Sequence, residues 1–429
     1  MALTNQQIAT RNSFLMVLEG TLFWAGLSFL EGNTVISVFM DQTTGSAAMA
    51  GLAATLKSGM FIVGQFILGM FVHRIRIQSH FMAIVGCLSR PLMLLMVPLL
   101  LGGLSGQAAA WVFLILYGLL FFADGMVGLC WNEICARTLA PSRRGEVIAL
   151  QQTFSGLVGL ASGAIIRQVF ASEITMQQQF AIIFGLSGVL TTLDAVILCL
   201  IRDRKHASRP DMKPLSPARY MTTLVPLISG NPGVRRVLLA RALYLLTLMS
   251  APINILFGIR QGGLNAAQQA TLVFMPVIGQ IIAGLLWARV SKRLGYPIMM
   301  LMAEALGIAC ALLNLLCMWM ARMGFSVMIP LSLAMILVSL NTSAYLAFQN
   351  HMVVIVPEDK RALYLVLASI LMAPLSLATY FAGLISEQFG FLPVYLIMLA
   401  AGVCGVILIY RNFLSPNSPL PESDRRAEI

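Results

Sequence analysis

Long apolar runs dominate this sequence and restrict its fold more than any other feature. Each run has about 20 residues or more, enough for an α-helix to cross the ~30 Å hydrocarbon core of a bilayer. Lipid offers no partner to a free backbone N–H group, and the ~10-residue alternation of a membrane β-barrel is missing, so helices are expected. Twelve spans are predicted, over residues 13–40, 47–72, 80–102, 107–136, 146–169, 178–201, 237–259, 267–288, 297–320, 325–352, 362–385 and 392–413.

The composition agrees with a membrane protein and excludes an ordinary soluble domain. Hydrophobic residues make up 59% of the chain and charged residues only 10%, with a mean hydropathy of +0.86. The seven cysteines lie inside apolar runs, and an odd number at that depth indicates free thiols. The four histidines are scattered along the chain. We therefore expect no metal site and no cofactor.

The basic residues are distributed unevenly among the connecting segments. With the N-terminus inside, 22 of the 28 lysines and arginines fall on one side of the membrane, three on the other and three within spans. This bias predicts that both termini are cytoplasmic in the inner or plasma membrane, and it requires an even number of spans. The net charge of +11 then reflects topology and contact with membrane lipid, and no nucleic-acid partner is expected.

The second half of the chain repeats features of the first. Gly64 to Gly69 reads Gly-Gln, three further positions and Gly, and Gly279 to Gly284 repeats this pattern about half a chain length later. Asp124 in span four and Asn341 in span ten have nearly the same separation, with similar residues following each. Such an offset indicates a duplicated chain and, in a membrane protein, a transporter built from two halves.

The repeat predicts four parts. Residues 1–201 form an N-terminal half of six helices and residues 237–413 a C-terminal half of six. A basic, proline-containing cytoplasmic linker joins them over 202–236. Residues 414–429 are expected to be a mobile cytoplasmic tail.

With these features the chain resembles the major facilitator superfamily, whose signature after spans two and eight is Gly-x-x-x-Asp-Arg-x-Gly-Arg-Lys/Arg. Gly69 and Arg74 match it in the first half, and Gly284, Arg289, Lys292 and Arg293 match it in the second. The acidic position is His73 in one copy and Ala288 in the other, which departs from the family pattern.

The resemblance implies an all-α membrane protein with twelve transmembrane helices in two pseudo-symmetric six-helix bundles. It also implies a secondary transporter that alternates access to a central site. The predicted cytoplasmic gate loops contain Gly69, His73, Arg74, Gly284, Arg289 and Arg293. Because the acids of the signature are missing, we expect Arg74 and Arg289 to reach helix C-termini or Glu133 and Glu146.

Ionisable residues inside spans are costly and mark functional candidates. Glu31 and Asp124 are the predicted proton-coupling residues, since spans one and four line the cavity of the resembled fold and an acid in an apolar cavity can hold a proton near neutral pH. Arg90 lies near the depth of Asp124, with Asp194 as a rival partner; it either binds substrate or fixes helix packing. Glu19 is nearer the cytoplasmic face, where a solvated or capping acid is expected.

The second half offers amides in its cavity-lining spans instead of acids. Acids facing amides suit a proton beside a polar or amphipathic solute, and they suit a dianion poorly. The predicted substrate contacts are Trp24, Asn33, Arg90, Trp131, Asn254, Asn341, Phe348 and Gln349.

The expected function is proton-coupled export of a small amphipathic drug or metabolite by a monomeric secondary transporter. The alternative is proton-coupled uptake of a small polar nutrient or organic solute. The glycines of span five, Gly156, Gly159 and Gly163, favour export. An enzyme acting on lipid intermediates is disfavoured because no acidic metal-binding pair and no His-Glu-x-x-His occurs, and an ATP-driven pump because no Gly-x-x-x-x-Gly-Lys-Ser/Thr occurs.

Overall fold

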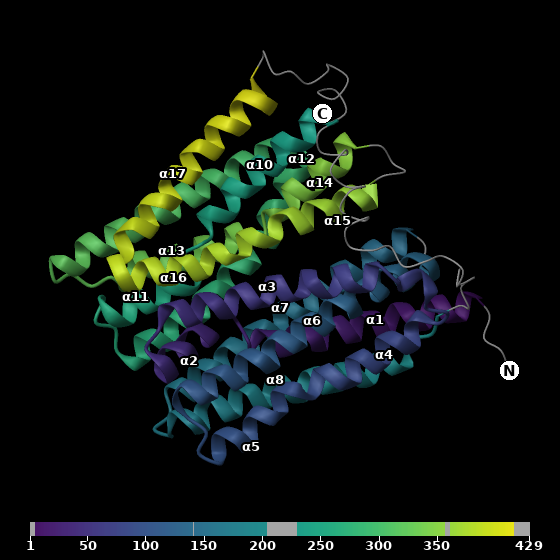
Figure 1. The fold of residues 1–429 in the computed structure, drawn as a ribbon, viewed down its shortest axis with the longest axis horizontal. Helices are drawn as coiled ribbons and strands as arrows, with labels where there is room; N and C mark the ends of the chain where they lie inside the picture. The colour runs from purple at the N-terminus through teal and green to yellow at the C-terminus, as the bar shows by residue number, and fades with distance from the viewer. Residues whose placement is uncertain (1–4, 140, 204–229, 357–360, 416–429) are drawn as a thin grey trace. The chain divides into compact units, whose positions relative to one another are not determined.

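The computed structural model describes residues 5–139, 141–203, 230–356 and 361–415, and it is helical throughout, with no β-strand in these ranges (Figure 1). The helices up to residue 203 are α1 (Asn5–Ser28), α2 (Val35–Thr44), α3 (Ala47–Gly69), η1 (Val72–Arg74), α4 (Gln78–Ser89), η2 (Arg90–Leu95), α5 (Met96–Leu101), α6 (Gly106–Thr138), α7 (Pro141–Phe170) and α8 (Met176–Leu200).

The second part of the chain is helical in the same way. Its helices are α10 (Pro232–Thr247), η3 (Ala251–Ile253), α11 (Asn254–Arg260), α12 (Ala266–Arg322), α13 (Met328–Thr342), α14 (Tyr345–Ile355), α15 (Arg361–Met372), η5 (Ala373–Leu377), α16 (Ala378–Phe389), α17 (Phe391–Ile409) and the π-helical turn η6 (Tyr410–Leu414).

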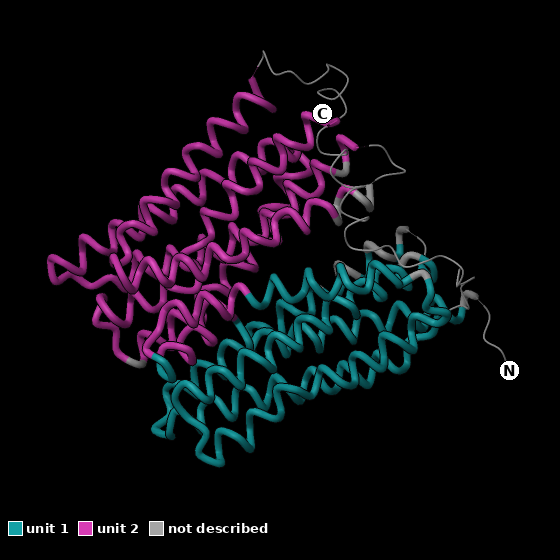
Figure 2. The backbone as a smooth tube through the Cα atoms, viewed as in Figure 1, with its two compact units in different colours: residues 1–31, 42–44, 56–217 teal, residues 32–41, 45–55, 218–429 magenta. Residues whose placement is uncertain are grey.

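The chain divides into two compact units (Figure 2). Unit 1 comprises residues 1–31, 42–44 and 56–217, and unit 2 comprises residues 32–41, 45–55 and 218–429. The two predicted halves, 1–201 and 237–413, stay a prediction. Most of the predicted linker 202–236 and nearly all of the predicted tail 414–429 lie outside the described residues.

Ten helical segments of the described chain are long and apolar enough to cross a membrane. The longest, α12, has 57 residues and would measure about 85 Å if it were straight. Gly295 interrupts it with a φ of +76°, a conformation that glycine adopts without steric cost. The loop predicted between residues 288 and 297 is therefore helical except for one turn at Gly295.

Five predicted spans are interrupted within the membrane-spanning run, a detail that apolar length alone does not reveal. The runs 80–102, 237–259 and 362–385 contain the 3-10 turns η2, η3 and η5, each with a proline in its first two positions. Proline has no N–H to donate to the preceding turn, so the α-helix ends there. The runs 13–40 and 325–352 are interrupted between α1 and α2 and between α13 and α14.

The first glycine of each sequence repeat lies where two helices pack closely. A methyl group on Gly64 of α3 would overlap the backbone carbonyl of Phe122 on α6. In the same way, a methyl group on Gly279 of α12 would overlap the carbonyl of Ile336 on α13. Phe122 and Ile336 are separated by nearly the same length of chain as the two glycines. The repeat in the sequence therefore corresponds to a repeated helix contact that needs glycine.

Polar contacts tie the segments around α2 and the start of α3 to the rest of unit 2. Arg260, at the end of α11, donates from Nε to Asp41 Oδ1 at 3.1 Å. Thr55 Oγ1 donates to the Ser376 carbonyl in η5 at 2.7 Å. These contacts explain why residues 32–41 and 45–55 group with unit 2.

Each unit has its own apolar core. In unit 1 the core runs between α1, α6 and α8 and includes Met16, Cys130 and Leu198, all fully buried. In unit 2 the core surrounds Tyr244 and Phe348, whose ring centroids lie 4.8 Å apart. The charged and polar side chains described next lie beside these cores.

Candidate functional site

A guanidinium group is buried in unit 1 where span three changes from α-helix to 3-10 helix. Arg90 begins η2 directly after α4, and its side chain is only 1% exposed. Pro91 follows it and cannot donate a backbone hydrogen bond, which favours the change of helix type. The Arg90 carbonyl accepts a hydrogen bond from Thr191 Oγ1 of α8 at 2.8 Å. This contact holds the turn against α8.

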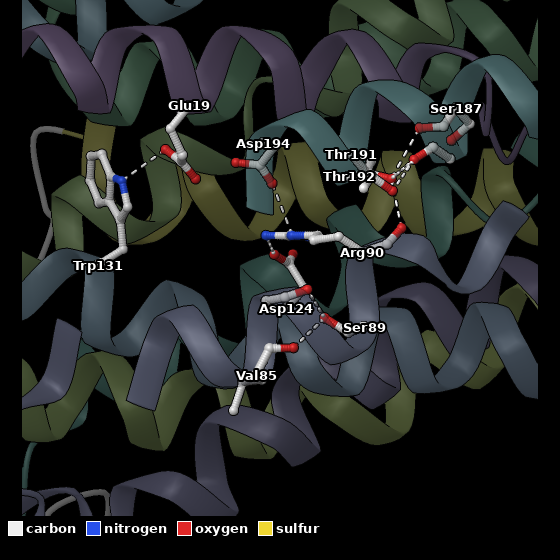
Figure 3. Close-up of polar contacts among 12 residues, drawn as sticks. Glu19, Val85, Ser89, Arg90, Asp124, Trp131, Ser187, Thr191, Thr192 and Asp194 are labelled. Atoms are coloured by element: carbon white, nitrogen blue, oxygen red, sulfur yellow. Dashed lines mark hydrogen bonds and ion pairs between the residues drawn. The ribbon is translucent and has the colours of Figure 1, made fainter. Parts of the chain in front are cut away.

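Two aspartates hold the guanidinium of Arg90 (Figure 3). Its Nη2 lies 2.9 Å from Asp124 Oδ1 on α6, and its Nε lies 3.0 Å from Asp194 Oδ2 on α8. The ring of Phe23 on α1 covers the same group, with its centroid 3.9 Å from Cζ. A cation above an aromatic face is attracted by the ring electrons. Side chains from α1, α6 and α8 thus converge on Arg90.

A third carboxyl group, Glu19 on α1, extends this network. Glu19 is 5% exposed, and its Oε2 accepts a hydrogen bond from Trp131 Nε1 on α6 at 2.9 Å. Glu19 and Asp194 also act on each other electrostatically, and the two carboxyl groups lie near each other in Figure 3. The two acids are thus close enough for the charge of one to disfavour ionisation of the other. We call these residues the Arg90 cluster: Glu19, Phe23, Arg90, Asp124, Trp131 and Asp194.

The charges of the Arg90 cluster do not balance if all its acids are ionised. Glu19, Asp124 and Asp194 then carry three negative charges against one positive charge on Arg90. Lys57 acts on Asp124 from a greater distance, and counting it still leaves one excess negative charge. An uncompensated charge in a low-dielectric interior is costly, and neighbouring carboxylates resist joint ionisation. The cluster therefore favours binding at least one proton.

The two predicted proton-coupling residues lie in different surroundings. Asp124 is 8% exposed and is part of the Arg90 cluster. Glu31 is half-buried in the break that follows α1, outside the cluster, where it acts electrostatically on Tyr117 of α6. The structure thus brings one of the two acids together with Arg90.

Glu19 is the cluster residue that the sequence analysis placed elsewhere. It was expected to be a solvated or capping acid, and instead it is buried and bonded to Trp131. Helical spacing carried a signal for this position, because Glu19 and Phe23 are four residues apart and share one face of α1. Asp124 and Trp131 are seven residues apart and share one face of α6 in the same way. Arg90, at the break in span three, lies against both this face of α1 and this face of α6.

The predicted substrate contacts are divided between the two units. In unit 1, Arg90 and Trp131 belong to the cluster, whereas Trp24 is 47% exposed on α1. The others belong to unit 2: Asn33 in the break before α2, Asn254 at the start of α11, Asn341 near the end of α13, and Phe348 and Gln349 on α14. Their roles in binding stay predictions.

A polar break in span ten connects several side chains of the second unit. The hydroxyl group of Tyr244 on α10 donates to the carbonyls of Asn341 at 2.7 Å and Thr342 at 3.2 Å. Trp287 Nε1 of α12 donates to the preceding carbonyl, that of Leu340, at 2.9 Å. The side-chain amide of Asn341 is fully buried and has no hydrogen-bond partner among the described residues. A buried amide without a partner is uncommon, which keeps Asn341 a candidate for the predicted role in binding.

The predicted gate-loop residues lie at helix ends and on exposed faces. Gly69 ends α3, and His73 and Arg74 form part of η1; the side chain of His73 lies outside the described residues. Gly284, Arg289 and Arg293 are exposed on α12.

The acids expected as partners of the gate arginines have partners of their own within unit 1. Arg289 Nη1 donates to the Leu285 carbonyl of its own helix at 3.3 Å. Glu133 accepts from Gln78 Nε2 at 2.5 Å, and Glu146 pairs with Arg143 at 3.5 Å. The contacts expected of Arg74 and Arg289 stay predictions.

Within the described ranges no group of three or more histidine, cysteine or acidic side chains is arranged to hold a metal ion. Two of the cysteines there, Cys87 on α4 and Cys199 on α8, lie with their Sγ atoms 3.4 Å apart as free thiols.

Comparisons with known proteins place this geometry in a familiar fold. The sequence profile described as Major Facilitator Superfamily matches residues 13–372. No curated protein sequence matches the chain. A solved D-xylose-proton symporter is similar with a TM-score of 0.70 at 12% identity, covering 94% of this chain and 97% of that chain.

Two further solved structures are similar over almost their whole length. A peptide transporter of the POT type has a TM-score of 0.67 at 15% identity, covering 96% of this chain and 99% of that chain. A bacterial homolog of the human lysosomal transporter Spinster, inward-facing and unoccupied, has a TM-score of 0.56 at 15% identity, with 94% of both chains covered. At these identities the likeness concerns the fold.

Proposed function

Because this chain belongs to the major facilitator superfamily, we propose that it is a secondary transporter that couples the movement of a small molecule to protons bound in the Arg90 cluster. The chain is an integral membrane protein with the transporter fold of that family. Two halves that alternate the access of a central site are the mechanism this fold supports.

Twelve spans in two six-helix bundles, with both termini cytoplasmic, are part of this proposal. Ten segments of the described chain are long and apolar enough to span. The segment 267–322 is one of these ten, and its turn at Gly295 divides it into two runs that can each cross the bilayer. Adding α1, which packs along α7 and α8 in unit 1, gives twelve. The bias of basic residues supports the cytoplasmic termini.

The observation that carries proton coupling is the excess of buried acid in the Arg90 cluster. Three carboxyl groups face one guanidinium group, and Glu19 and Asp194 act on each other electrostatically. Loss of a proton from the cluster adds a negative charge next to Arg90, and gain of a proton removes one. Each step changes how firmly α1, α6 and α8 are held together, which couples protonation to helix movement. The D-xylose-proton symporter of the same fold supports this reading.

For the substrate we propose a small amphipathic compound that is neutral or positively charged. The excess negative charge of the cluster disfavours an anion, and the rings of Phe23 and Trp131 beside Glu19 and Arg90 supply faces that attract apolar or cationic groups. Export remains the preferred direction. Proton-coupled uptake of a polar solute is the second candidate, and the symporter and peptide transporter among the similar structures favour it.

Proteoliposomes with a trapped pH-sensitive dye test the proposed function. Addition of a transported compound is expected to move protons across the vesicle membrane, and an imposed pH gradient is expected to drive accumulation of the compound. Reversing the gradient separates export from uptake. Glu146→Gln is the matched control, since Glu146 is an exposed acid paired with Arg143 outside the cluster. Proton movement that is equal in Glu19→Gln, Asp194→Asn and the control would contradict the assignment.

A further inference from the structure

A buried carboxyl group in unit 2 has no counterpart charge. Glu304 lies on α12, and its side chain is fully buried. Its carboxyl group lies against Gly405 of α17, where a methyl group on residue 405 would overlap it. A methyl group on Gly402, one turn earlier, would contact the Glu304 backbone carbonyl. Gly405 thus leaves the space that the Glu304 side chain fills, and Gly402 allows the backbone of α12 to lie close to α17.

The surroundings of Glu304 supply neither a cation nor a hydrogen bond among the described residues. Neither carboxyl oxygen has a partner there, and no charged side chain in the described part of the chain acts on it. On α10 the titratable neighbour is Tyr244, on which Glu304 acts electrostatically. The other charged group of α10, Arg241, acts instead on Tyr244 and Tyr345. The facing turns of α17 present Gly402 and Gly405.

A carboxylate without a cation or donors is strongly disfavoured in such a place, whereas a protonated acid is neutral and compatible with it. We propose that Glu304 is a proton-binding site in unit 2, separate from the Arg90 cluster, and that its proton stays bound at neutral pH. The proposal rests on burial and packing and does not depend on the proposed transport activity.

Tyr244 connects this proton to the polar break in span ten. Its hydroxyl group donates to the carbonyls of Asn341 and Thr342, and Glu304 acts on the same tyrosine. A phenol next to a negative charge is a weaker donor than one next to a neutral acid. Loss of the Glu304 proton therefore weakens the hydrogen bonds that hold the carbonyls between α13 and α14. We infer that alkaline pH loosens this break.

Infrared spectroscopy of the purified protein tests the proton directly. The C=O stretch of a protonated carboxylic acid lies apart from the bands of carboxylates and of the backbone. At pH 7 the spectrum of the wild type is expected to contain one such band that is missing in Glu304→Gln and still present in Glu146→Gln. Identical acid bands in the wild type and Glu304→Gln would overturn the proposal.

A second measurement keeps the proposal testable if Glu304→Gln does not fold. Labelling the wild type with carbonyl-¹³C glutamate shifts glutamate bands and leaves aspartate bands unchanged. A glutamate acid band that persists from pH 5 to pH 7 and disappears at alkaline pH supports Glu304, and it is expected to shift in Tyr244→Phe. A band that is already lost at pH 5 would overturn the site. A band that is unchanged in Tyr244→Phe would overturn the connection to span ten.

Discussion

The Arg90 cluster and Glu304 show two ways in which one kind of helical scaffold accommodates a buried acid. Arg90, Asp124 and Asp194 of unit 1 correspond in sequence to Glu304, Asn341 and Gly405 of unit 2, each about half a chain length further on. In unit 1 these three positions hold charged side chains that form ion pairs with one another. In unit 2 a single acid lies among an amide, a tyrosine and glycines.

The Arg90 cluster can change its net charge by gaining or losing protons, whereas Glu304 keeps one charge state. The cluster holds three acids, and Trp131, which bonds Glu19, is only half-buried. Protons can therefore be exchanged between acids without leaving any of them unpartnered. No second carboxyl group and no basic side chain in the described part of the chain acts on Glu304. This contrast leads us to assign the transported protons to the cluster and a resident proton to Glu304.

The largest expected effect is that of removing the cation of the cluster. Arg90→Ala leaves three buried acids without their partner, and breaking a buried ion pair in this way costs about 3–5 kcal/mol of unfolding free energy. Thermal or denaturant unfolding in detergent measures the loss. The triple variant Arg90→Ala, Asp124→Asn, Asp194→Asn is expected to regain most of the stability. A loss of less than about 1 kcal/mol in Arg90→Ala would contradict the ion-pair network.

A smaller loss of stability is expected for a change at Gly405, the residue of unit 2 that corresponds in sequence to Asp194. Gly405→Ala places a methyl group in the space of the Glu304 carboxyl group, and overpacking of this kind costs about 1–3 kcal/mol. Adding Glu304→Ala to Gly405→Ala frees that space, so the double variant should lose less than the sum of the two single losses. Gly284→Ala is the control, since a methyl group there meets open space. Additive losses would show that Glu304 and Gly405 do not share this space.

Trp131→Phe removes one hydrogen bond from the cluster and leaves its charges in place. The Trp131 N–H stabilises the ionised form of Glu19, so without it the acid binds its proton more firmly and the pH midpoint of transport is expected to move upward. A hydrogen bond to a charged group is worth about 1.5–3 kcal/mol, which corresponds to about 1–2 pH units. The pH profile of transport in proteoliposomes checks this shift, and a downward movement of the midpoint would contradict it.

The smallest effect is expected for Glu304→Gln at acidic pH. A glutamine has nearly the same shape and charge as a protonated glutamic acid, so below about pH 4, where the unfolded glutamate is protonated as well, the unfolding free energy should change by less than about 0.5 kcal/mol. Stability of the wild type should then decline from about pH 4.3, where the unfolded glutamate ionises, up to the pH at which folded Glu304 loses its proton, and Glu304→Gln should lack this part of the decline. Unfolding scans from acidic to alkaline pH measure both. Equal declines in the two proteins would argue for an ionised Glu304 at neutral pH.

Much of the fold could be predicted from the sequence because lipid restricts spanning segments to long apolar helices. The apolar runs located the membrane segments, and the repeat beginning at Gly64 and Gly279 marked real helix contacts. Of the breaks in five spans, the one at Arg90 has a local signal in the sequence, since Pro91 follows it and proline ends an α-helix. A single proline or asparagine inside an apolar run hardly changes the mean hydropathy of the run, so a hydropathy scale does not reveal the helix break.

The candidate site was predicted only in part. The sequence gives the depth of a residue along its span, but it does not show which neighbouring helix the side chain faces. Asp124, Asp194, Arg90 and Trp131 were singled out by their rarity in apolar spans. Glu19 was misjudged because counting residues along α1 gives depth but not which face packs against α6 and α8. Glu304 is likewise an ionisable residue within a predicted span, and only the packing of α12 on α17 shows that it has glycines for neighbours.

The central claim is that the transported protons bind in the Arg90 cluster, and compound-driven proton movement in proteoliposomes tests it most directly. At matched protein density, Glu19→Gln and Asp194→Asn should each reduce the initial rate of proton movement at least about tenfold, because each removes one of the acids that can bind the proton. Glu146→Gln should retain the wild-type rate. Wild-type rates in both cluster variants would show that the protons are carried elsewhere and would contradict the claim.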